Sequence, residues 1–174
     1  MGTAQRATTA SVLFWGAAIA GIVHAASSLY WAVGGRMLLE TVGQWAIEAM
    51  ATDRTRAVLV LSVTGLLKLS AALLPLGVAY GLVPWERFWR TLAWPGAIGL
   101  IGYGSLHVVL GVLVLSGIIR PDGGYDHDAI FGHAAIWGPL FMVWGLLLAG
   151  ALWLSQPGRR ARSRERGRRL VTNA

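Results

Sequence analysis

The sequence predicts an all-α membrane protein, a four-helix bundle whose helices run up and down across the bilayer. Of its 174 residues, 55% are hydrophobic and 13% are charged, whereas charged residues make up about a quarter of an ordinary soluble domain. Four apolar stretches are long enough to cross a hydrocarbon core of ~30 Å, which takes ~20 helical residues. Backbone groups in lipid must be bonded within their own segment, so these stretches are helices and not strands. The length fits a single domain, and the absence of Cys excludes disulfides and thiolate metal sites.

We expect the four helices at residues 11–33, 57–83, 94–119 and 129–155, which together form one transmembrane domain over residues 11–155. Residues 1–10 precede this domain as a short cytoplasmic segment. Glycines recur in the third stretch, and small residues let membrane helices approach closely. The first stretch could instead be a cleaved signal peptide, because residues 23–25 loosely resemble a cleavage site. Its flank carries only Arg6, however, and His24 lies within the apolar run, so we expect this helix to be retained.

The net charge of +7 comes mainly from the C-terminal tail, residues 156–174, and not from a folded surface. Seven of its residues are arginines: Arg159, Arg160, Arg162, Arg164, Arg166, Arg168 and Arg169. So charged a segment cannot bury a core, and we expect it to be disordered. Its simplest partner is anionic lipid, at ~1 kcal/mol per basic residue near the surface, and we expect no nucleic-acid partner. Because basic segments stay inside, the tail is predicted to be cytoplasmic, and an even number of crossings places the N-terminus there too.

Lys68 lies near the middle of a long apolar run, residues 58–74. A charge at that depth costs at least ~2.5–3.5 kcal/mol on insertion scales, so the side chain must face a protein interior or a wet cavity. At ~1.5 Å per residue, His24 and His107 fall at about the same depth on their own helices. Helical wheels place all three residues on faces rich in small and polar side chains. No carboxylate lies within the four apolar cores to serve as a counter-ion for Lys68.

These residues predict a polar intramembrane pocket that opens outward and whose floor is formed by Lys68, His24 and His107. The further candidates to line it lie mostly nearer the outer surface: Tyr103, Ser27, Ser28, His133, Trp137 and Glu40. Taken singly, His24 or His107 is more simply a hydrogen-bonding group between helices, worth ~0.6–2 kcal/mol. Lys68 is the residue for which a functional role is the better interpretation, because a buried charge without a partner is costly.

Two outer segments carry the remaining polar residues. Residues 37–50 read as an amphipathic helix, either a surface connector or a lid, and Glu40 is its best candidate to face the pocket. Residues 120–128 hold carboxylates and a histidine, which could bind a divalent metal together with His133. Their spacing matches no defined metal-binding loop, and a cap on the last helix by Asp126 or Asp128 is the simpler interpretation. We therefore expect no metal, and no cofactor.

Two stretches together resemble a known family. The first is HAASSLYWAVGG at residues 24–35, and the second is IRPDGGYD at residues 119–126, followed by GH at 132–133 and WGPLF at 137–141. They resemble a family of small four-helix bacterial membrane proteins, common in actinobacteria and catalogued only as a domain of unknown function. The resemblance covers most of residues 11–155, and implies this fold and a bacterial plasma-membrane location. It adds no catalytic residue, and the final helix has Gly-Pro-Leu where other members often have Ser-Pro-Leu.

Four functions fit these residues. The protein could bind or move a small anionic or amphipathic molecule at Lys68, which is the function we favour. It could be an enzyme that acts on a lipophilic substrate through proton transfer by His and Lys. It could hold a haem between His24 and His107, or it could be a structural or accessory subunit. Neither the substrate nor the oligomeric state follows from the sequence.

Overall fold

The computed structural model describes residues 2–156, and every regular element in this range is helical. The elements are α1 (Thr3–Ala32), α2 (Gln44–Thr52), α3 (Arg54–Ala79), α4 (Glu86–Leu115), α5 (His127–Gly132), a π-helical turn η1 (His133–Trp137) and α6 (Gly138–Leu154). Four helical stretches are long and apolar enough to span a membrane: α1, α3, α4 and the continuous run His127–Leu154. The predicted all-α, four-helix architecture is confirmed. The Arg-rich tail, apart from its first residue, lies outside the described residues.

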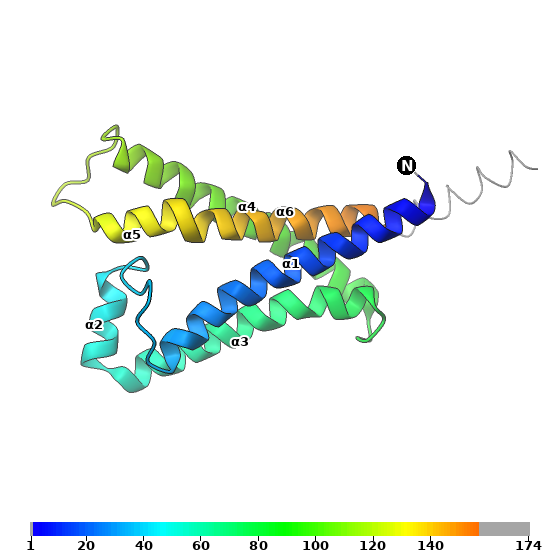
Figure 1. Ribbon diagram of the computed structural model, residues 1–174, viewed down its shortest axis with the longest axis horizontal. Coiled ribbons are helices and arrows are strands. Elements are labelled where there is room, and N and C mark those ends of the chain that lie inside the picture. Colours follow the sequence, from blue (N-terminus) through cyan, green and yellow to red (C-terminus); the bar gives the residue numbers. More distant parts are fainter. Residues whose placement is uncertain (1, 157–174) are drawn as a thin grey trace, which may run out of the picture.

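The four long helices alternate in direction and form two pairs (Figure 1). In one pair α1 packs along α3, and in the other α4 packs along α6. A third extensive contact, between α1 and α6, joins the pairs, whereas α3 and α4 touch only slightly. The pairs splay apart toward the end of the bundle that carries α2, which we call the α2 end, and the N-terminus lies at the opposite, terminal end. The bundle is therefore open along its α3–α4 side.

Small residues allow neighbouring helices to pack closely, as the sequence predicts. A Cβ atom at Gly21 of α1 would lie 2.6 Å from the Ala72 Cβ of α3 and 2.7 Å from the Trp144 ring of α6. A Cβ at Gly104 of α4 would lie 2.5 Å from the Gly138 carbonyl oxygen of α6. All three distances are shorter than side chains tolerate, so glycine is what lets these helices approach. The main core lies around Trp144 and is completed by the apolar residues Phe14, Ala17, Leu76, Ala97, Leu148 and Leu152.

The helix ends differ from those predicted by apolarity alone. Helices α1 and α4 begin eight residues before the expected positions 11 and 94, because helical turns continue into the polar flanks. The amphipathic helix expected at residues 37–50 is a shorter α2 that begins only at Gln44. Gly43 precedes it with φ of +130°, a conformation that residues with side chains rarely adopt. Residues 37–42 instead form turns that fold back onto Trp31 near the end of α1 and onto η1.

Candidate functional site

Lys68 lies at the meeting point of three helices. From α3, its Nζ donates a hydrogen bond to Ser28 Oγ of α1 at 3.0 Å and lies 3.3 Å from His24 Nδ1, one turn earlier on α1. The ring of Phe141 of α6 lies 5.8 Å from the same nitrogen. His24 and Ser28 are buried, and Lys68 is half-buried. We call these four residues the Lys68 cluster.

The Lys68 cluster contains no carboxylate. Within residues 2–156, no Asp or Glu lies within ion-pair distance of the Lys68 ammonium. A hydroxyl, an imidazole nitrogen and an aromatic face are neutral partners, which offset part of the cost of burying a charge but do not neutralise it. The sequence predicts that Lys68 has no counter-ion in the apolar cores, and the described fold likewise places no carboxylate beside it.

A second group of predicted residues gathers on the α4–α6 side. The rings of His107 and His133 stack with centroids 4.5 Å apart, and the ring of Tyr103 meets the edge of His107 at 4.4 Å. Tyr103 is 49% exposed. We call Tyr103, His107 and His133 the aromatic row.

The Phe141 ring connects the two groups. It lies 3.8 Å from the His24 ring and 5.1 Å from the Tyr103 ring, between centroids. The structure therefore places Lys68, His24 and Ser28 in one cluster and the aromatic row beside it, rather than all of them around one shared centre.

The turn η1 positions two predicted residues against the loop that precedes α2. Trp137 Nε1 donates to Thr41 Oγ1 at 3.0 Å, and His133 Nε2 donates to the Val42 carbonyl at 3.3 Å. The Trp137 ring also lies 5.5 Å from His24. π-helical turns frequently occur at functional sites. Here η1 holds His133, which stacks on His107, and Trp137, which contacts His24.

Two predicted residues lie apart from both groups. Ser27 Oγ donates to the Val23 carbonyl of its own helix at 3.1 Å. Glu40 is exposed and lines a groove of about 470 Å³ beside Arg36 and Arg54 at the α2 end. Within the described residues Glu40 makes no ion pair, and it does not reach Lys68. The sequence pattern could not resolve this, because the segment around Glu40 is not helical.

The carboxylate-rich segment before α5 is a helix cap, as expected. Asp126 Oδ1 accepts a hydrogen bond from the Ala129 amide at 3.1 Å, and its Oδ2 accepts one from the Gln44 amide at 2.9 Å. The Ala129 bond, followed by the Gln44 bond, lowers the pKa of Asp126 below its ordinary value. This side chain therefore ties α5 to the start of α2. Within residues 2–156, no three His, Asp or Glu side chains gather in a way that could hold a metal ion.

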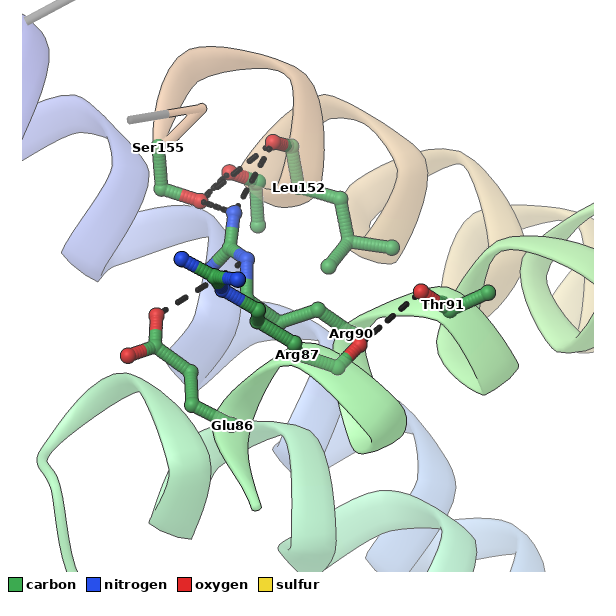
Figure 2. Close-up of polar contacts among 7 residues, drawn as sticks. Glu86, Arg87, Arg90, Thr91, Leu152 and Ser155 are labelled. Carbon is green, nitrogen blue, oxygen red and sulfur yellow. Dashed lines mark hydrogen bonds and ion pairs between the residues drawn. The ribbon is translucent and has the colours of Figure 1, made fainter. Parts of the chain in front are cut away.

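The terminal end carries a polar cluster that the sequence pattern did not reveal (Figure 2). Arg90 of α4 donates to Ser155 Oγ at 2.8 Å and to the Leu152 carbonyl at 3.4 Å, and its Nε lies 3.9 Å from Glu86. The guanidinium thus bonds one backbone carbonyl and one side-chain hydroxyl at the end of α6, where a positive charge is favoured.

Beside the Arg90 cluster is a cavity of about 400 Å³, lined by the ends of α1, α3, α4 and α6. Tyr80 closes it from α3, where its hydroxyl accepts a hydrogen bond from Trp15 Nε1 at 3.0 Å and lies 2.9 Å from Ser11 Oγ. The hydrogen bond to Ser11 and then that from Trp15 lower the pKa of Tyr80. The polar contacts of this end therefore join α1 to the end of α3, and α4 to the end of α6.

Comparison with known proteins agrees with this architecture. A family model described as "Protein of unknown function (DUF3995)" matches residues 21–148, which include every residue of the Lys68 cluster and of the aromatic row. No curated protein and no solved structure matches the chain.

Proposed function

The chain belongs to the DUF3995 family of proteins of unknown function, and we propose that it binds a small anionic or amphipathic molecule within the membrane at Lys68. The ammonium group provides the attraction, and Ser28 and His24 hold it in place. A ligand that carries a negative charge supplies the counter-ion that the fold lacks.

One observation carries this proposal, which is the absence of any carboxylate near Lys68 in the described residues. A charge inside a membrane domain costs several kcal/mol unless it is paired, and such residues commonly mark ligand or ion pathways. Structural hydrogen bonding alone does not require a lysine. A serine or asparagine would join α1 to α3 without the cost of a buried charge.

Access to Lys68 follows from the open side of the bundle. Helices α3 and α4 touch only slightly, and Tyr103 on the α4 side is exposed. Lys68 itself is half-buried, so its side chain is not sealed inside the core.

A binding measurement on purified protein in detergent tests the proposal. Butanoate should bind to the unaltered protein, and Lys68→Met should weaken that binding at least tenfold. Arg36→Met removes an equal charge from the exposed loop before α2 and should leave binding unchanged. Equal binding by the unaltered protein and Lys68→Met would overturn the proposal.

The aromatic row supports a second candidate, an enzyme that transfers protons on a lipophilic substrate. Tyr103 and His107 are proton-transfer groups in ring contact, and Tyr103 is open to the membrane. Conversion of one lipid species should then stop in His107→Phe while butanoate binding persists. An unchanged lipid profile in a strain that lacks the protein would reject this function.

We further propose that the protein lies in the bacterial plasma membrane with both termini in the cytoplasm. Support comes from Arg6, from Arg87 and Arg90 at the start of α4, and from the seven tail arginines, all on one predicted side. The tail then binds anionic lipid of the inner leaflet. A reporter active only in the cytoplasm should be active when it follows residue 174, and an inactive one would contradict this orientation.

A further inference from the structure

An apolar groove runs along the open side of the bundle. It lies between α3 and α4, has a volume of about 480 Å³, and is floored by Trp144 and Leu148 of α6. Pro75 of α3 and Pro95 of α4 both line it. Ser70 contributes the only side-chain hydroxyl or charge among the lining residues, and the rest is hydrocarbon, proline, glycine or indole.

The groove adjoins the Lys68 cluster. Leu67 and Ala71, which flank Lys68 on α3, both line the groove. On its floor, the Trp144 ring lies 6.4 Å from Phe141 and 6.5 Å from His24, between centroids. Lys68 is not itself a lining residue, but its helical neighbours Leu67 and Ala71 place the ammonium group beside the apolar trough.

The ammonium group of Lys68 and the apolar groove follow one another along the bundle axis. Helical side chains lean toward the N-terminus of their helix, which directs Lys68 toward the α2 end. Its partner Ser28 lies four residues before the end of α1, or ~6 Å from that end at ~1.5 Å per residue. The groove residues Ser70, Leu74 and Pro75 continue from Lys68 in the opposite direction.

We infer that the ligand is a membrane amphiphile with one acidic head group and a hydrocarbon chain, with the head at Lys68 and Ser28 and the chain in the groove between α3 and α4. This inference rests on the proposed function and specifies its ligand class. The charge of the single ammonium selects an acidic head, and the apolar lining selects an alkyl chain.

Two glycines of α4 provide a matched pair of variants. A Cβ atom at Gly96 or at Gly99 would have no neighbour within 4 Å, so both positions accept a side chain without disturbing the fold. Only Gly96 lines the groove. Gly96→Leu therefore fills the groove, and Gly99→Leu adds the same side chain to the same helix outside it.

Alkyl carboxylates from butanoate to decanoate serve as probes for the full-length protein in detergent. In the unaltered protein, affinity should rise with chain length, up to about fourfold per buried methylene. Gly96→Leu should weaken decanoate binding at least tenfold and leave butanoate binding within twofold, whereas Gly99→Leu should match the unaltered protein. All proteins face the same detergent, so chain partitioning into micelles cancels in the comparison.

The outcomes separate this inference from the proposed function. If Gly96→Leu binds decanoate as tightly as Gly99→Leu does, the chain does not occupy the groove and the inference is wrong, although binding at Lys68 stands. The inference is also wrong if Gly96→Leu only dissociates an oligomer, since a second copy would then cover the groove. If Lys68→Met binds every probe as the unaltered protein does, the proposed function itself fails.

Discussion

The ammonium of Lys68 donates a hydrogen bond to Ser28 across the contact between α3 and α1, with 3.0 Å between Nζ and Oγ. Ser28 is almost fully buried, so this bond is the most enclosed polar link that Lys68 makes.

Ser28→Ala should lower the free energy of unfolding by about 1–3 kcal/mol, because it leaves a charged donor with one partner fewer. Thermal unfolding in detergent measures this loss. Ser27→Ala is the matched control, since the Ser27 hydroxyl bonds only to its own helix. Equal loss in the two variants would show that the Lys68 bond does not contribute to stability.

Gly21→Val should destabilise the bundle by about 1–3 kcal/mol or prevent its assembly, because it overpacks a filled core. The added atoms would collide with Ala72 and Trp144, where three helices meet. Gly102→Val places the same side chain where nothing lies within 4 Å and should change the unfolding temperature little. Comparable unfolding temperatures for both variants would contradict the packing at Gly21.

Arg90→Met should reduce stability by about 1.5–3 kcal/mol, the range for hydrogen bonds to a charged group. The variant loses the bonds to Ser155 and to the Leu152 carbonyl that hold the end of α6 to α4. Arg87→Met removes the same charge from an exposed position one turn away and should have an effect within about 0.5 kcal/mol. Chemical unfolding followed by tryptophan fluorescence compares the two.

Asp126 should make the α2–α5 contact dependent on pH. Its hydrogen bonds lower the pKa in the folded state, so its stabilising effect is complete above the ordinary pKa of ~3.9. The effect disappears as pH falls through the lower, folded-state pKa. The unfolding temperatures of the unaltered protein and Asp126→Ala should therefore differ at neutral pH and converge below about pH 4.

Asp122→Asn is the control for that pH series, because Asp122 makes no hydrogen bond through its side chain in the described structure. A gap between the unaltered protein and Asp126→Ala that persists to the lowest pH would show that the charge of Asp126 is not what holds the contact.

The sequence predicts the parts of this protein that depend on periodicity and on the cost of charge in lipid. Lys68, His24 and Ser28 share faces of their helices, and the structure brings them into contact. Periodicity gives no information on loops, however. Glu40 was expected beside the pocket but is exposed, while Thr41, its neighbour, is the residue that bonds Trp137.

Helix wheels also treat every small residue of one face as an interior residue. Gly104 does meet α6, but Gly96 and Gly99 of the same glycine-rich stretch have open space around them. The reason is the unequal packing of the helices: α4 contacts α6 along its length and barely contacts α3. Which neighbours a helix has is a tertiary property that its own pattern does not contain. The same holds for Arg90, whose acceptors lie more than sixty positions later.

The pairing of α1 with α3 has a consequence for biogenesis. Chains emerge from the ribosome N-terminal end first, so His24 and Ser28 are synthesised before Lys68. When α3 enters the bilayer, the polar partners of its lysine are already present on α1. The ammonium group of Lys68 is therefore hydrogen-bonded as soon as α1 and α3 pair. The later hairpin, α4 with α6, adds Phe141 and the aromatic row to a charge that the earlier half of the chain has already accommodated.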